Sequence, residues 1–119
     1  MTRSSIEVLE YVVKAADSKF AEDIVALEMK DVSLLADYFV ITHANSERQL
    51  DAIAKSILDA ADEHNQAVKR VEGKDNGKWV LIDLGDVIIH LFSEEERDFY
   101  NLEKLWSDAE QVDVSDWLG

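Results

Sequence analysis

The sequence of 119 residues contains no cysteine. Disulfides, thiolate nucleophiles, and zinc or iron–sulfur sites built on cysteine are therefore excluded. The chain also lacks any stretch near the ~20 apolar residues that cross a bilayer, and residues 1–17 interrupt their apolar positions with charged ones. We therefore expect a protein of the cytoplasm with neither a signal peptide nor a membrane span.

Glycine is scarce, and its placement excludes one class of site. Gly73, Gly77, Gly85 and Gly119 never cluster in front of a predicted helix. A phosphate-binding loop of the Walker or dinucleotide type needs such a cluster. We therefore do not expect nucleotide binding from this sequence.

Basic residues are also few, 12 against 26 acidic ones, which gives a formal net charge of −14. A surface with this field is repelled by a bare phosphate backbone and by anionic lipid. The aromatic residues are not interleaved with lysine and arginine, as they would be on an RNA-binding sheet. We expect little direct contact with nucleic acid, no membrane contact, and a partner with a basic surface.

Helices are predicted at three capping boxes, where a serine lies three residues before glutamate or glutamine. The pairs are Ser4 with Glu7, Ser46 with Gln49, and Ser93 with Glu96. The first helix should end near residue 17 or 18. The second has a one-sided apolar stripe and should end near Asn65 in a left-handed conformation, and the third should end at about residue 100.

Strands are predicted where β-branched and aromatic residues concentrate, at residues 23–29, 38–42, 68–72, 79–84 and 87–92. The last two are almost continuously apolar, which is typical of strands covered on both faces. Polar connections are expected at residues 30–33, 43–46 and 73–77. The order of elements predicts one small α/β domain, residues 1–109, with a mixed sheet of about five strands and packed helices. Residues 110–119 are predicted to form an acidic C-terminal tail.

Asp83 and Asp86 flank a Leu-Gly pair between the two apolar strands. Paired carboxylates on a hairpin can hold a divalent cation or share a proton. Aspartates beside such a turn more commonly accept hydrogen bonds from turn amides, and we favour that interpretation. Gly85 is expected to supply a backbone angle that other residues avoid.

The histidines suggest structural roles. His43, His64 and His90 have no companions at metal-ligand spacing and form no readable catalytic triad. His90 alternates with Ile88 and Phe92 on one strand face. Ser46 is explained by helix capping and is not needed as a nucleophile.

A further aromatic and apolar series follows the third predicted helix, interspersed with charged residues. Its members are Tyr100, Leu102, Leu105 and Trp106. Rings flanked by charge are common anchors at protein interfaces. Core packing at the edge of the sheet is an equally good interpretation.

These motifs stand in an ordered set along the chain. The set consists of residues 37–41 (DYFVI), 46–49 (SERQ), 72–73 (EG), 79–92 (WVLIDLGDVIIHLF) and 100–106 (YNLEKLW). In order and spacing this set resembles the ribosomal silencing factor family RsfS, also called Iojap, over about residues 3–109.

The resemblance implies a factor without catalytic residues, metal or cofactor. It implies binding to the large ribosomal subunit through that subunit's basic protein numbered fourteen, at the face that joins the small subunit. Subunit association would thereby be blocked and translation repressed when nutrients are scarce. It also implies a nucleotidyltransferase-like fold, although the spacing of Asp83 and Asp86 departs from that fold's metal-binding pair. A small metal-dependent nucleotidyltransferase-like enzyme is the alternative, and a homodimer off the ribosome is compatible with the first interpretation.

The resemblance also implies a set of residues that face or position the partner. The set consists of Trp79, Asp83, Asp86, His90, Tyr100, Leu102, Glu103 and Trp106, supported by Asp37, Tyr38 and Arg48. Each of these residues is also compatible with a purely structural role.

Overall fold

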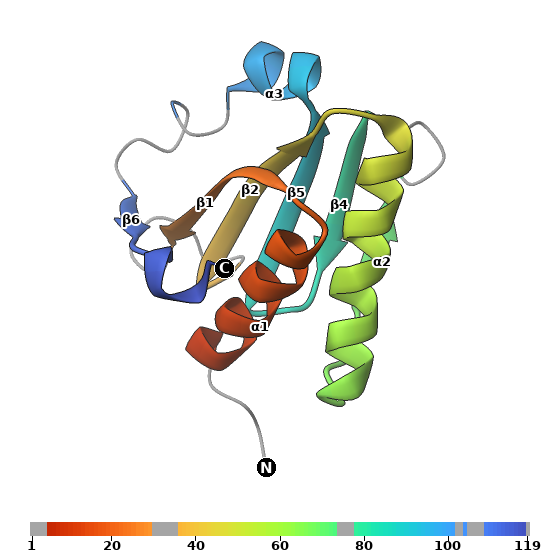
Figure 1. Ribbon diagram of the computed structural model, residues 1–119. Coiled ribbons are helices and arrows are strands. Elements are labelled where there is room, and N and C mark those ends of the chain that lie inside the picture. Colours follow the sequence, from red (N-terminus) through yellow and green to blue (C-terminus); the bar gives the residue numbers. More distant parts are fainter. Residues whose placement is uncertain (1–4, 30–35, 74–77, 102–103, 105–108, 119) are drawn as a thin grey trace.

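The computed structural model describes residues 5–29, 36–73, 78–101, 104 and 109–118. The elements, in chain order, are α1 (Ser5–Ser18), β1 (Glu22–Glu28), β2 (Tyr38–Ala44), α2 (Glu47–Glu63), β3 (Arg70–Glu72), β4 (Trp79–Asp83), β5 (Val87–Ser93), α3 (Glu94–Tyr100), β6 (Glu110–Val112) and the 3-10 helix η1 (Ser115–Trp117) (Figure 1). The predicted order of helices and strands is confirmed as far as α3. None of the described helices is long and apolar enough to span a membrane.

The strands form one mixed sheet in the order β3-β4-β5-β2-β1-β6. β2 and β5 run parallel, and the other neighbouring pairs run antiparallel. The predicted α/β class is confirmed, but the sheet has six strands instead of about five. The additional strand is β6, which pairs with β1 through Leu27 and Gln111.

The segment predicted to be a tail therefore packs against the domain as far as Trp117. β6 extends the sheet, and Val114 is buried in the core beneath it. Three residues are too few to display a strand period, so the sequence pattern alone did not indicate β6.

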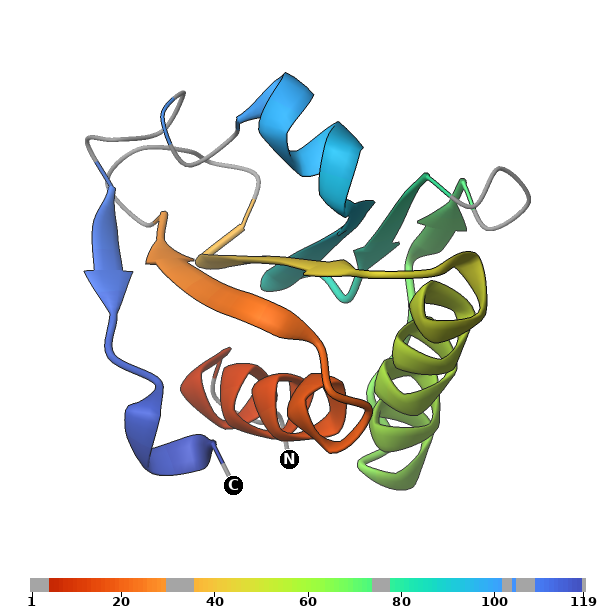
Figure 2. The same ribbon diagram turned by 45° about the horizontal axis from the view of Figure 1, so that its top comes forward.

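Helices cover the two faces of the sheet unequally. α1 and α2 lie together on one face and α3 lies on the other (Figure 2). β5 is buried from Val87 to Phe92, as predicted for a strand covered on both sides. The same prediction is wrong for β4, where Val80 and Ile82 are buried but the residues between and beside them are partly exposed. The reason is that α3 packs on β5 and β2.

The serine N-caps of two of the three predicted capping boxes are confirmed. The Gln49 amide donates to Ser46 Oγ at 3.1 Å, and the Glu96 amide donates to Ser93 Oγ at 3.3 Å. The third box involves Ser4, which lies outside the described residues. Side-chain acceptors of this kind satisfy amide groups that have no partner within the first helical turn.

The ends of the elements differ slightly from the prediction. Asn65 follows α2 with φ of 57°, so the predicted left-handed stop is confirmed. His43 and Ala44 were expected in a turn, but both belong to β2. The predicted connection at residues 30–33 lies outside the described residues, as does most of the one at residues 73–77.

Candidate functional site

Three side chains of β4 lie partly exposed on the α3 side of the sheet. We call Trp79, Leu81 and Asp83 the β4 stripe. Alternate residues of a strand point to the same face, and four residues of strand span about 13 Å. Among the described residues, the three-residue strand β3 alone separates β4 from the edge of the sheet. The stripe is thus a narrow, rigid surface with an aromatic end and an acidic end.

His90 lies buried behind this stripe, opposite Leu81 on the neighbouring strand. Trp79 Nε1 donates to His90 Nδ1 at 3.4 Å, and the ring of Phe39 meets the imidazole edge-on at 5.2 Å. Burial lowers the pKa of His90 from 6.5 to about 4, because the charged imidazolium is poorly solvated there. His90 is therefore neutral at pH 7, and since Nδ1 accepts a hydrogen bond, its proton is on Nε2. This hydrogen bond holds the Trp79 indole against His90.

The carboxylate of Asp83, at the end of β4, has partners within the protein. Asp83 Oδ1 accepts a hydrogen bond from the Gly85 amide at 2.8 Å, and Arg70 Nε lies 3.7 Å from the other carboxylate oxygen. The interpretation that the aspartate binds a turn amide is confirmed for Asp83. Among the described residues, no group of three or more His, Asp or Glu side chains could hold a metal ion.

Asp86 differs from Asp83 because its side chain is exposed. Its backbone carbonyl accepts from the amides of Asp37 at 2.8 Å and Tyr38 at 3.1 Å. The structure thus brings Asp37 and Asp86 together at the same end of the sheet as Asp83. We call Asp37, Asp83 and Asp86 the acidic corner.

The other predicted site residues fall elsewhere. The side chain of Tyr38 is buried in the core beneath α1 and α2, and Arg48 is exposed on α2, on the opposite side of the sheet from α3. Leu102, Glu103 and Trp106, with the side chain of Tyr100, lie outside the described residues. The predicted site residues on β4, on β5 and in the turn between these strands therefore lie close together. Tyr38 and Arg48 lie apart from them.

The backbone conformation of Gly85 predicts that a side chain at this position destabilises the protein. Its φ is 92°, and a Cβ built there would lie 3.4 Å from Lys69 Cε. Because L residues with a side chain are strained in this region, we expect Gly85→Ala to lower the free energy of unfolding by about 1–2 kcal/mol. Chemical denaturation measures this loss. Gly85→Asn is the control, since asparagine tolerates positive φ better, and an equal loss in both variants would show that strain is not the cause.

A second polar cluster was not predicted from the sequence. Arg97 Nη1 lies 2.9 Å from His43 Nδ1, and His43 Nε2 lies 3.2 Å from a Glu22 carboxylate oxygen. A guanidinium can only donate, so Nδ1 accepts and the imidazole proton is on Nε2, facing Glu22. The cluster ties α3 to β1 and β2, and confirms a structural role for His43. Its members are up to 75 positions apart, so no local pattern indicates it.

Comparison with known proteins identifies the family. The family model described as "Ribosomal silencing factor during starvation", RsfS, matches residues 2–118. The chain belongs to the RsfS family. The ribosomal silencing factor RsfS of Bacillus subtilis (strain 168) is 53% identical over 107 residues, which are 90% of this chain and 91% of that protein.

A more distant relative and a solved structure also match this chain. The chloroplastic protein Iojap of Arabidopsis thaliana is 38% identical over 101 residues, which are 85% of this chain and 42% of that protein. A crystal structure of a Bacillus halodurans protein matches with a TM-score of 0.82 and 49% identity, over 91% of this chain and 98% of that one. The resemblance to RsfS and Iojap is confirmed. The chain is a ribosomal silencing factor of a non-enzymatic family, so the transferase alternative is set aside.

Proposed function

We propose that this RsfS-family protein binds the large ribosomal subunit in the cytoplasm and sterically blocks its association with the small subunit, which represses translation. The observation that carries the proposal is the β4 stripe with the neighbouring acidic corner. Trp79 and Leu81 offer apolar contact area on a rigid strand, and Asp83 and Asp86 add negative charge at one end. Aromatic anchors beside charged groups are typical of the centres of protein interfaces.

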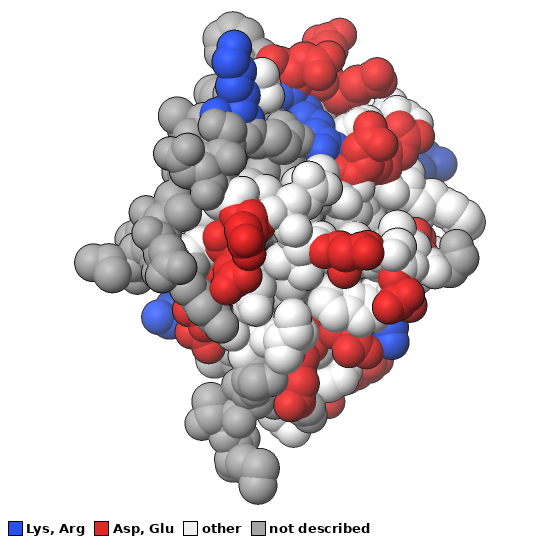
Figure 3. All heavy atoms as spheres, turned by 90° about the vertical axis from the view of Figure 1, so that its left-hand side faces the viewer, with Lys and Arg blue, Asp and Glu red and all other residues white. Residues whose placement is uncertain are grey.

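The charge of the chain favours a protein partner over ribosomal RNA. The formal net charge is −14, and acidic side chains spread over much of the face shown in Figure 3, with fewer basic ones. Such a field attracts a basic protein and opposes close approach to phosphate. We propose that the partner is the basic protein numbered fourteen of the large subunit.

The size of the protein supports a steric mechanism. A standard interface buries ~800 Å² on each partner, and the protein exposes 6994 Å². Most of a body measuring 36 × 33 × 28 Å would therefore project from the subunit surface. A rigid body of this size at the joining face excludes the small subunit without any chemical step.

Sedimentation with purified subunits tests the proposal. We expect the protein to co-sediment with large subunits and not with small ones, and to be displaced by an excess of purified protein fourteen. The association rate should fall as salt rises, because opposite charges steer the encounter. Equal binding to both subunits or to protein-free ribosomal RNA would contradict the proposal.

A further inference from the structure

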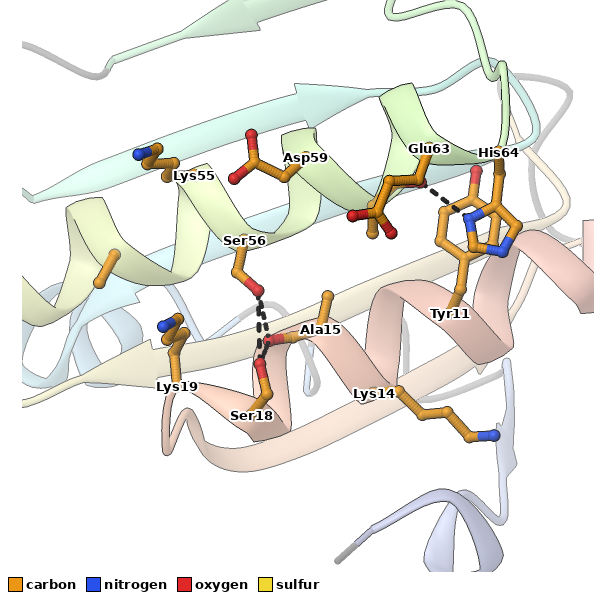
Figure 4. Close-up of a pocket in the computed structure, with 12 residues that line it drawn as sticks. Tyr11, Lys14, Ala15, Ser18, Lys19, Lys55, Ser56, Asp59, Glu63 and His64 are labelled. Atoms are coloured by element: carbon orange, nitrogen blue, oxygen red, sulfur yellow. Dashed lines mark hydrogen bonds between the residues drawn. The ribbon is translucent and has the colours of Figure 1, made fainter.

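A groove lies between α1 and α2 (Figure 4). These two helices cover the face of the sheet opposite to the β4 stripe (Figure 2). The volume of the groove is about 620 Å³, which falls within the range of about 300–1,000 Å³ typical of small-molecule sites. Its lining side chains come from both helices. The site proposed on β4 makes no use of it, so an inference drawn from the groove does not depend on the proposed function.

One end of the groove is cationic. The ammonium groups of Lys19, directly after α1, and Lys55, on α2, both lie at this end (Figure 4). Lys14 also lines the groove, but it pairs with Glu10 at 2.9 Å and points away from the other two lysines (Figure 4). In a chain where acidic residues outnumber basic ones 26 to 12, this pair offers a local site for an anionic group.

The middle of the groove carries two hydroxyl groups. Ser18 Oγ donates to the Ala15 carbonyl at 2.7 Å, and Ser56 Oγ donates to the same carbonyl at 3.0 Å. A hydroxyl has one proton and two acceptor lone pairs. The two oxygens lie 3.4 Å from each other. With both protons directed at Ala15, each oxygen keeps a lone pair that can accept a hydrogen bond from a hydroxyl group of a ligand.

The other end is aromatic and acidic. The rings of Tyr11 and His64 stack at 4.1 Å with an interplanar angle of 11°, and His64 Nδ1 lies 2.9 Å from the Ala60 carbonyl. A carbonyl only accepts, so this bond places the imidazole proton on Nδ1 and holds the ring plane. The carboxylates of Asp59 and Glu63 lie between the rings and the lysines (Figure 4). This end can stack a flat ring and accept hydrogen bonds from its amino group.

We propose that the α1–α2 groove binds a purine nucleoside 5′-monophosphate whose base carries an amino group, as in AMP or GMP. The phosphate lies between Lys19 and Lys55, the ribose hydroxyls donate to the serine oxygens, and the base lies beside His64 with its amino group toward Glu63. Lys55 and Glu63 are eight positions apart on one helix, about 12 Å at 1.5 Å per residue. This separation suits the extended length of such a nucleotide.

The order of charges along the groove favours a purine nucleoside monophosphate over inorganic phosphate or a nucleoside. Inorganic phosphate would meet the two lysines but gain nothing from the rings or from the carboxylates of Asp59 and Glu63. A nucleoside without phosphate would leave the lysines unused. The absence of a glycine-rich loop does not oppose the proposal, because here side chains of two helices hold the phosphate and no reaction takes place.

Calorimetric titration of the full chain with AMP, GMP, guanosine and inorganic phosphate tests the proposal. We expect saturable binding of the two nucleotides, and weaker binding of guanosine and phosphate. Lys55→Gln should weaken nucleotide binding at least about tenfold, as expected for loss of a charge-assisted hydrogen bond. Lys14→Gln removes the same charge from the same helix pair and should change binding less than about twofold.

Nitrogen-15 NMR shift mapping with GMP locates the site and shows that both variants are folded. The expected shifts lie in α1 and α2, around Ser18, Ser56 and His64. Three results would each overturn the proposal: no saturable nucleotide binding, phosphate binding as tight as that of GMP, or equal weakening by Lys14→Gln and Lys55→Gln. Binding to large subunits is read separately, so its failure would contradict the proposed function and leave the groove result intact.

Discussion

Replacing Asp86 by lysine is expected to weaken binding to the large subunit by about tenfold or more, while the free energy of unfolding stays nearly unchanged. The carboxylate is exposed, and the bonds that Asp86 makes to Asp37 and Tyr38 use its backbone carbonyl, which lysine retains. Close charge pairs at protein interfaces couple by about 1.5–7 kcal/mol. Reversal of one partner should therefore cost much of the affinity for a basic surface.

The matched control is Asp51→Lys. Asp51 is exposed on α2, on the other side of the sheet, and its replacement changes the net charge by the same amount. Sedimentation binding and denaturant unfolding are measured for both variants. Equal weakening by the two would mean that only net charge matters, and unfolding of Asp86→Lys would show that Asp86 is structural.

Acid is expected to destabilise the protein through His90. The folded pKa of about 4 is below the ordinary value of 6.5. The unfolded state therefore binds a proton more readily, and the contribution of neutral His90 is complete above pH 6.5 and is lost as pH falls toward 4. With about 1.4 kcal/mol for each pKa unit, the loss amounts to about 3 kcal/mol.

Denaturant unfolding from pH 7.5 to pH 4 measures this, with His90→Phe as the comparison. Carboxylates titrate in both proteins, so the difference between the two curves isolates His90. We expect the stability of the natural chain to fall more steeply than that of His90→Phe. Parallel curves, or an NMR titration that places the pKa of His90 near 6.5, would contradict the assignment.

The local parts of the fold could be predicted from the sequence. The boxes at Ser46 and Ser93 define helix starts through contacts three residues apart, and Asn65 ends α2 through its own backbone angle. The turn at Asp83 is equally local, since its carboxylate bonds an amide two residues away. Such contacts depend on few residues, so a pattern can indicate them.

The parts that depend on distant neighbours could not be predicted in the same way. β4 is as apolar as β5, yet its outer face stays partly exposed because α3 packs over β5 and β2. Tyr38 lies in a strand buried on both faces, where periodicity does not indicate which face a side chain occupies. The contact of Arg97 with His43 joins positions 54 residues apart, and no spacing in the sequence indicates it.

The most direct test of the proposed function is a subunit-joining assay with purified ribosomal subunits and increasing amounts of the protein. We predict that joined ribosomes decrease in proportion to the large subunits occupied, and that Asp86→Lys at the same concentration leaves joining nearly intact. Undiminished joining while the natural protein is bound to the large subunit would contradict it.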